Sequence, residues 1–286
     1  MVLPIRGLLI WIGLIASTTL RANSLAQFRT VLGDLEVELL DAEKPATVAN
    51  FKRYVAAGLY NNSFLHRVVN NDIFVAQGGG FVITDPVTTF LGTIPTFPPV
   101  TNEFLTGPFR SNVAGTIAMA KSANPDSATS QFFFNLLDNS AALDNTNNSG
   151  GFTVFGRVRG ETNVLAVLNS FVRNPASGTN LIYNAGGVFA ELPLLTFRLS
   201  PLKHLDASTL IYVDISLLSV RVTGTPAGRE ISWDSARGGT NHVEFTTEFP
   251  PVWQSLTNLV KPAGARSSVI DANSDRNRFY RVRISY

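Results

Sequence analysis

The chain has 286 residues, of which 45% are hydrophobic and 15% are charged, and it contains 22 glycines, 15 prolines and 20 phenylalanines. This composition favours a β-rich globular protein over a helical or disordered one, with enough length for one large domain or two modest ones. Cysteine is absent, which excludes a thiol nucleophile, a thiolate metal site and a redox motif. The three histidines lie far apart in the sequence, which argues against a zinc site.

Residues 1–26 have the pattern of a secretory signal peptide. An apolar run at 7–20 follows a single early cation and precedes several small residues. The run is shorter than the roughly 20 apolar residues of a spanning helix, so a cleaved leader is favoured over the alternative, a retained membrane anchor. Small residues at 22–24 and at 24–26 offer two cleavage points, and we favour cleavage after Ala26.

Removal of this leader changes the charge of the chain. The full chain has a formal net charge of +2, but the leader carries Arg6 and Arg21, and the remainder has 21 basic and 21 acidic side chains. A near-neutral chain gives no support to a nucleic-acid partner. We therefore expect no nucleic-acid binding, and no stable membrane insertion once the leader is cleaved.

The first half of the remaining chain predicts a hairpin, a helix and several strands. Residues 28–41 alternate apolar and polar side chains and turn at 33–34. Residues 45–57 carry apolar side chains at helical spacing, after a proline that a first helical turn tolerates. Two short strands follow within 63–82, and residues 84–110, rich in proline, threonine and glycine, predict a long surface loop.

The second half predicts further strands and then a separate module. The expected elements are strands at 115–120, 130–137 and 152–160, a helix at 161–171, a loop-like segment, and a strand at 209–222. The composition then changes to that of a linker, and the last part of the chain holds several short β-like pieces. The sequence thus predicts a main domain over 27–222 and a small β-sandwich-like module over 223–286, to which we assign no ligand.

Neither a phosphate loop nor a nucleophile site is indicated. The stretch AQGGGF at 76–81 lacks the G-x-G-x-x-G spacing and predicts a glycine turn or bulge between strands. The G-x-S-x-G motif is absent. His66 stands in an apolar strand context, where a lone histidine is usually a hydrogen-bonded structural residue.

Four separated segments carry a family resemblance, in order and in approximate spacing. They are FLHRV at 64–68, FVAQGGGF at 74–81, GTIAMAKSANPDSATSQFFFN at 115–135, and LDN followed by GFTVFGRV within 143–158. With these segments the chain resembles the cyclophilin family of peptidyl-prolyl isomerases, particularly its exported bacterial branch, over about residues 28–222. The resemblance implies a mainly β fold, a closed eight-stranded antiparallel barrel capped by two helices. It also implies a substrate groove on the outside, because side chains fill the interior of so small a barrel.

The resemblance further implies the residues of that groove. Arg67 matches the catalytic arginine of the family. The matches to substrate-binding positions are Phe74, Val75, Gln77, Ala120, Lys121, Gln131, Phe133, Leu143 and Phe152. Ala120 and Lys121 would bind the peptide through their backbone, the two glutamines would hold the flanking peptide, and the apolar side chains would grip the proline ring.

The stretch SQFFFN illustrates how one strand would serve both the groove and the core. Successive side chains of a strand point to opposite faces. Gln131 and Phe133 would therefore face the groove, while Phe132 and Phe134 would point into the barrel as core residues.

Three positions depart from the family pattern. The chain between Arg67 and Phe74 is two residues longer than the usual turn, with the extra residues within 70–73. Ala142 stands where the family has a tryptophan or phenylalanine, so the resemblance implies weak binding of ciclosporin. Phe152 takes the place of a histidine or tyrosine.

The chemistry that the resemblance implies requires no bond cleavage. Rotation about an X-Pro bond must break amide resonance, against a barrier of roughly 18–20 kcal/mol. We therefore expect no metal and no cofactor. Arg67 would donate a hydrogen bond to the proline nitrogen of the twisted amide, or else brace the carbonyl oxygen. The expected function is isomerisation of proline-containing polypeptides, assisting the folding of exported proteins in the periplasm or outside the cell. The alternative is a low-turnover module of the same fold that binds proline-containing segments.

Overall fold

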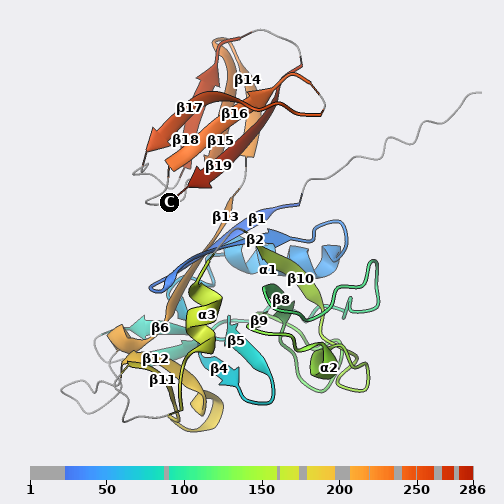
Figure 1. Ribbon diagram of the computed structural model, residues 1–286, viewed down its shortest axis with the longest axis vertical. Coiled ribbons are helices and arrows are strands. Elements are labelled where there is room, and N and C mark those ends of the chain that lie inside the picture. The colour runs from blue at the N-terminus through green and yellow to red at the C-terminus, as the bar shows by residue number, and fades with distance from the viewer. Residues whose placement is uncertain are drawn as a thin grey trace, which may run out of the picture.

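The computed structural model describes residues 23–86, 90–159, 162–173, 179–196, 207–218, 220–234, 240–248, 250–260, 266–273 and 277–285. Most of these residues form strands, arranged in a larger N-terminal part and a smaller C-terminal part (Figure 1). None of the helices in these ranges combines the length and the hydrophobicity of a membrane-spanning segment. The apolar run predicted at 7–20 lies outside the described residues.

The larger part is built on one antiparallel sheet of eleven strands, in the order β4-β5-β9-β8-β10-β2-β1-β13-β3-β6-β7. The strands are β1 (Leu25–Thr30), β2 (Gly33–Leu39), β3 (Ser63–Phe64), β4 (Arg67–Asn70), β5 (Phe74–Gly78), β6 (Phe81–Asp85), β7 (Phe90–Thr93), β8 (Thr116–Met119), β9 (Phe132–Asn135), β10 (Val154–Arg159) and β13 (Tyr212–Leu218). Strand β7 lies inside the segment 84–110 that the sequence predicted as a loop. The segment predicted to hold two short strands within 63–82 contains β3, β4, β5 and the start of β6, while the strands predicted at 28–41, 115–120, 130–137 and 152–160 are present.

The sheet closes on itself because β3 and β4 are two parts of one continuous stretch. They lie far apart in the strand order, yet only Leu65 and His66 separate them in the chain. The N–H of Leu65 donates to the carbonyl of Ile211 (2.9 Å), and the N–H of His66 donates to the carbonyl of Gln77 (3.0 Å). Residues 63–70 therefore pair with β13 on one side and with β5 on the other, which confirms a closed barrel of eight strands. The β6–β7 hairpin extends from it.

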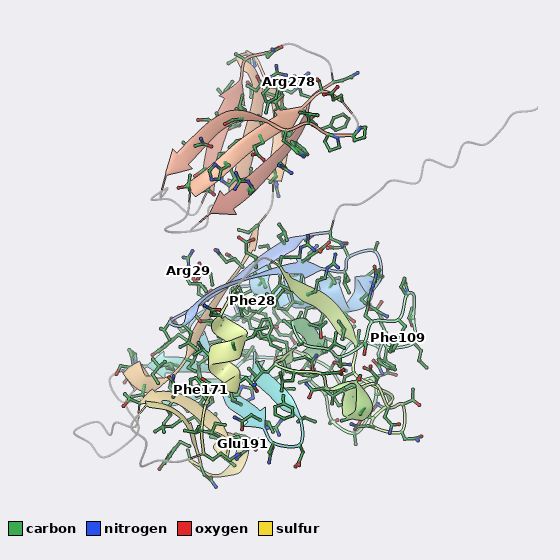
Figure 2. The ribbon with its side chains drawn as sticks, viewed as in Figure 1. Phe28, Arg29, Phe109, Phe171, Glu191 and Arg278 are labelled. Carbon is green, nitrogen blue, oxygen red and sulfur yellow. The ribbon has the colours of Figure 1, made fainter. Side chains whose placement is uncertain are left out.

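Aromatic side chains fill the interior of this barrel (Figure 2). The ring of Phe28 lies with its centroid 5.4 Å from that of Phe132 and 5.1 Å from that of Phe134, both in edge-on geometry. Phe51 of helix α1 (Pro45–Ala56) stacks on Phe28 from the helix side, with centroids 5.8 Å apart. Helix α3 (Val164–Asn169) buries Val164 and Leu168 against the same core. The alternation predicted for the strand at 130–137 thus places Phe132 and Phe134 inside.

The segment that the sequence predicted as loop-like contains a hairpin. Strands β11 (Thr179–Tyr183) and β12 (Leu192–Thr196) form a two-stranded sheet, joined through the short 3-10 helix η2 (Gly187–Phe189). Leucines of both strands pack with Phe64 and Ile83 in a second apolar cluster. The hairpin is therefore a packed element beside β3, β4 and β6.

The smaller part consists of two three-stranded antiparallel sheets. One contains β14 (Val220–Thr225), β15 (Gly228–Asp234) and β18 (Arg266–Asp271), and the other β16 (Thr240–Thr246), β17 (Gln254–Val260) and β19 (Phe279–Ser285). Their shared core holds Ile231, Trp233 and Val243. The run predicted as a single strand at 209–222 is divided, since β13 pairs in the barrel and β14 pairs with β15. In the structure, the barrel ends with β13 at Leu218, and the strands of the smaller part begin with β14 at Val220.

The first described residues are tied to the barrel. Ala26 is fully buried in β1, where it lies opposite Val37 and Leu217. The N–H of Ser24 donates to Asp41 (2.7 Å), and the ammonium of Lys52 binds both of these side chains. Cleavage after Ala26, which the sequence favoured, would remove the first two residues of β1, whereas cleavage after Ser24 leaves the strand whole.

We predict that a chain beginning at Gln27 is less stable than one beginning at Asn23, by roughly 2 kcal/mol in the free energy of unfolding, because ladder hydrogen bonds and a buried alanine are lost. Urea unfolding measures the difference. A chain beginning at Leu25 is the control and should lose less. Equal stability of all three chains would contradict the importance of these residues for β1.

Candidate functional site

A row of side chains crosses the outer face of the barrel. Arg67 of β4 lies opposite Gln77 of β5, and Gln77 lies opposite Phe133 of β9. Residues that lie directly opposite one another in a sheet share a face. Because Val68 is buried in the barrel core, its neighbour Arg67 and the row that begins there face outward. The fold thus brings these three predicted site residues together.

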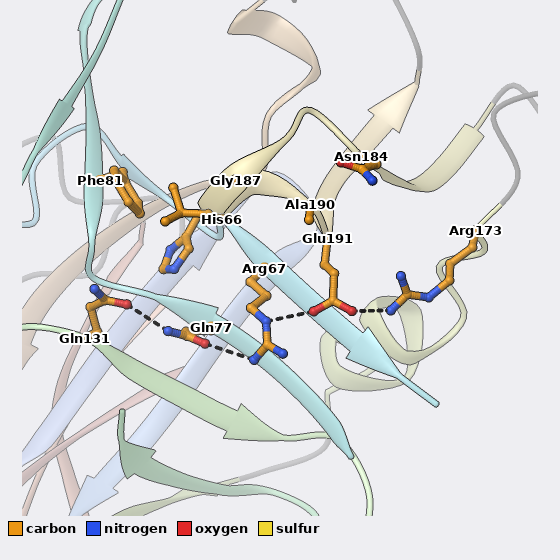
Figure 3. Close-up of a pocket in the computed structure, with 11 residues that line it drawn as sticks. His66, Arg67, Gln77, Phe81, Gln131, Arg173, Asn184, Gly187, Ala190 and Glu191 are labelled. Carbon is orange, nitrogen blue, oxygen red and sulfur yellow. Dashed lines mark hydrogen bonds and ion pairs between the residues drawn. The ribbon is translucent and has the colours of Figure 1, made fainter. Parts of the chain in front are cut away.

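Hydrogen bonds join the polar members of the site in a continuous chain (Figure 3). Gln77 donates through Nε2 to Oε1 of Gln131 (2.8 Å), and its own Oε1 lies 3.4 Å from Nη1 of Arg67. Nε of Arg67 donates to Oε2 of Glu191 (2.8 Å), and Oε1 of Glu191 accepts from Nη2 of Arg173 (2.5 Å). Among the described residues, Nη2 of Arg67 has no hydrogen-bond partner.

This polar chain borders an open groove with a volume of about 540 Å³. One wall is formed by residues of the barrel and the opposite wall by the turn between β11 and β12. The lining residues are His66, Arg67, Gln77, Phe81, Gln131, Arg173, Asn184, Gly187, Val188, Ala190 and Glu191. The sequence identified Arg67 and the two glutamines, but none of the hairpin residues.

A cluster of mostly buried apolar side chains adjoins the polar chain on the same face of the barrel. We call it the groove cluster, and its members are Leu40, Val69, Val75, Ala118, Phe133, Leu143 and Val154, with Ile73, Ala120, Ala142 and Phe152 packed against them. The rings of Phe133 and Phe152 meet edge to face, with centroids 5.9 Å apart. The structure therefore brings Val75, Phe133 and Leu143 together with Ala120 and Phe152, as the resemblance implied.

Phe74 is the exception, and its predicted place in the pocket is corrected. Its side chain packs against the barrel core, and Ile73 packs against the groove cluster instead. Val75 and Gln77 face outward, so strand alternation turns Phe74 inward. Phe74 begins β5 directly opposite Asn70, the last residue of β4.

Asn139, which the sequence analysis missed, holds the turn between β4 and β5 in place. The N–H of Phe74 donates to Oδ1 of Asn139 (2.8 Å), and Nδ2 of Asn139 donates to the carbonyl of Phe74 (2.9 Å). Nδ2 also donates to Asn135 (2.8 Å), which is fully buried. Asn139 directly precedes helix α2 (Ser140–Leu143), so these bonds connect the turn to the helix that supplies Leu143. The sequence signal for this role was a pair of asparagines beside apolar strand residues, because buried polar side chains are almost always hydrogen-bonded.

Ala120 packs against the groove cluster, and Lys121 follows it in the chain. The ammonium of Lys121 binds the carbonyl of Ser149 and lies 4.3 Å above the ring of Phe152. Burial lowers the pKa of Lys121, while Asp126 acts in the opposite direction. The N–H of Ala120 is already bonded to the carbonyl of Gln131 (2.9 Å), but the backbone N–H and C=O of Lys121 have no partner among the described residues. These two groups are available for an extended peptide.

His66 lies at the base of the groove in a neutral state. It is 3% exposed, and its Nδ1 has no hydrogen-bond partner among the described residues. Its pKa is lowered from 6.5 to about 4, first because the ring is buried and second because Arg67 is charged, while a hydrogen bond with Gln131 acts in the opposite direction. In the part of the chain that the structure describes, no group of three metal-ligating side chains comes together.

The low pKa of His66 predicts a pH dependence of stability. Between pH 6.5 and about 4 the unfolded chain binds a proton that the folded chain does not, so the free energy of unfolding falls on acidification, by up to about 3 kcal/mol. His66→Gln should reduce this loss. Urea unfolding of both proteins from pH 7 to 4 isolates the effect, since the carboxylates titrate in both. Identical pH profiles would rule it out.

Comparisons with known proteins identify the family of this chain. The sequence model of the family described as "Cyclophilin type peptidyl-prolyl cis-trans isomerase/CLD" matches residues 25–182. The peptidyl-prolyl cis-trans isomerase of Acinetobacter baylyi is 40% identical over 146 residues, which are 51% of this chain and 72% of the relative. Peptidyl-prolyl cis-trans isomerase A of Dickeya dadantii is 43% identical over 129 residues, or 45% of this chain and 62% of the relative.

Among solved structures, cyclophilin AquaCyp293 from Hirschia baltica is 20% identical to this chain. The match covers 74% of this chain and 79% of that structure's chain, with a TM-score of 0.45. From the family match and the two sequence relatives, the chain belongs to the cyclophilin-type peptidyl-prolyl cis-trans isomerases.

Proposed function

We propose that this protein catalyses cis–trans isomerisation of X-Pro peptide bonds. The observation that carries the proposal is the row Arg67, Gln77 and Phe133, which sets a guanidinium beside an apolar surface on the outer face of a rigid barrel. Both sequence relatives are named peptidyl-prolyl cis-trans isomerases, which supports the same activity here.

The reaction requires stabilisation of a twisted amide. The barrier to rotation is roughly 18–20 kcal/mol, while cis and trans X-Pro forms differ by only about 0.5–1 kcal/mol. Catalysis therefore depends on binding the twisted state better than either planar form. In the twisted state the proline nitrogen regains its lone pair and accepts a hydrogen bond. Arg67 can donate it, because its Nη2 amino group has no partner among the described residues.

The rest of the site holds the substrate on either side of that bond. The groove cluster, to which Phe133 belongs, offers apolar side chains for contact with the pyrrolidine ring. The free backbone groups of Lys121 can pair with an extended peptide, and Gln131 lies between them and Arg67. Anchoring the proline while the preceding carbonyl rotates is catalysis by positioning.

The substrates that this site fits are proline-containing polypeptides. Ala142 packs against the groove cluster without the large aromatic ring of the family pattern, which supports our proposal that ciclosporin binds weakly. We also propose a role in the folding of exported proteins, in the periplasm or outside the cell. The leader-like pattern of residues 1–26 supports it. Recovery of the protein only from the cytoplasmic fraction of its producing cells would contradict this location.

We predict that Arg67→Ala lowers kcat/KM on a short X-Pro peptide by at least roughly 100-fold, because the donor to the twisted amide is lost. An NMR exchange assay without protease measures it. Arg157→Ala is the matched control, since Arg157 pairs with Glu38 on a different part of the barrel, and it should retain activity. A wild-type protein that binds the peptide without accelerating isomerisation would contradict the enzymatic function and leave a proline-binding module.

Substitutions of two neighbouring phenylalanines test which face of the strand belongs to the core and which to the groove. Phe132→Leu should lower the free energy of unfolding by about 1–3 kcal/mol with little change in kcat/KM, because this ring lies inside the barrel. Phe133→Leu should lower kcat/KM by roughly tenfold, because this ring belongs to the groove cluster. Urea unfolding and the exchange assay on both variants test the pair, and equal effects on activity would refute the division of faces.

A further inference from the structure

We propose that Glu191 is a positioning residue for the catalytic Arg67. It lies on the β11–β12 hairpin, beyond residue 182 where the match to the family model ends. This inference rests on the proposed isomerase activity, because it concerns the orientation of the group that acts on the amide. Figure 3 shows the carboxylate of Glu191 between two guanidinium groups, those of Arg67 and Arg173.

The bond from Arg67 to Glu191 is the shorter of its two contacts. Nε of Arg67 lies 2.8 Å from Oε2 of Glu191, whereas Nη1 lies 3.4 Å from Oε1 of Gln77. A guanidinium is planar, so holding Nε fixes the directions of both Nη groups. Charge-assisted hydrogen bonds are also stronger than neutral ones. Glu191 thus determines where the free Nη2 donor points.

The backbone at Glu191 is held in place by a hydrogen bond to β4 and by the packing of its neighbours in the chain. The carbonyl of Glu191 accepts a hydrogen bond from the N–H of Val68 (2.9 Å), the residue that follows Arg67. Two residues earlier, the ring of Phe189 packs on Phe81 with centroids 4.7 Å apart. The next residue, Leu192, is buried in the cluster below. Strand β4 therefore holds both partners of the pair. Arg67 is a residue of this strand, and the backbone of Glu191 is hydrogen-bonded to it.

Arg173 keeps the site positively charged. A carboxylate paired with Arg67 alone would neutralise the charge that the twisted amide meets. Here the second oxygen of Glu191 binds Arg173 (2.5 Å), and the three groups together carry a net charge of +1. All three line the groove, so Arg67 is held in place without loss of the positive potential in the groove.

The test compares Glu191→Ala and Glu191→Gln with the wild-type protein. The matched control is Glu244→Ala in the C-terminal part, because Glu244 likewise lies between two arginines, Arg281 and Arg283. Four quantities are measured for each protein: kcat and KM on an X-Pro peptide, the melting temperature, and the NMR signal of the Nε–H group of Arg67, assigned by its loss in Arg67→Lys.

We expect Glu191→Ala to lower kcat by roughly tenfold with little change in KM, because the peptide is still anchored while the donor is misplaced. Its Arg67 Nε–H signal should broaden through solvent exchange. Glu191→Gln should recover most of kcat and of the signal, since the amide oxygen can still accept from Nε. Glu244→Ala should match the wild type in kcat and KM.

The other outcomes overturn the inference. An unchanged kcat in Glu191→Ala shows that Arg67 needs no carboxylate, and a raised KM with unchanged kcat shows that Glu191 binds substrate. If Glu191→Ala fails to fold, Glu191→Gln decides the question. A folded Glu191→Gln protein without the Nε–H signal of Arg67 would refute the hydrogen bond between residues 67 and 191. An inactive wild-type protein refutes the proposed function, while the NMR signal still reports on the Arg67–Glu191 contact.

Discussion

The closure of the barrel through residues 63–70 is the constraint on which the site depends. This stretch pairs with β13 through β3 and with β5 through β4. Arg67 stands where it completes the ring, at one end of the row that continues through Gln77 and Phe133. A residue on a strand with hydrogen-bonded neighbours on both sides has little backbone freedom, which a positioned catalytic donor requires.

The filled interior of the barrel explains why the site lies outside. Eight strands enclose only enough space for side chains, and here Phe28, Phe132 and Phe134 occupy it in mutual edge-on contacts. Phe133 then points outward with the groove cluster. Three consecutive phenylalanines of one strand therefore have two roles. Phe132 and Phe134 stabilise the fold, and Phe133 belongs to the groove cluster.

The sequence could predict the parts of the site that lie in regular strands. Arg67, Gln77 and Phe133 belong to segments whose order and alternation fix their direction. Phe74 was misplaced, because it lies an odd number of residues before Gln77 in β5, and strand alternation turns its side chain toward the core. Glu191 could not be found. The segment around it has no clear strand periodicity, and its approach to Val68 depends on a hairpin that packs only in the complete fold.

The energetics of the ion pairs around Glu191 indicate orientation as their role. The side chains of Arg67, Glu191 and Arg173 are 35%, 20% and 41% exposed, and pairs with that degree of exposure contribute only about 0–1 kcal/mol to stability. The hairpin itself is held by its buried leucines, which pack around Phe64, and by the hydrogen bond from the N–H of Val68. Removing the carboxylate would therefore leave the fold intact and release only the guanidinium. A contact that stabilises the protein so little, yet fixes the plane of its catalytic donor, acts on the reaction rather than on the fold.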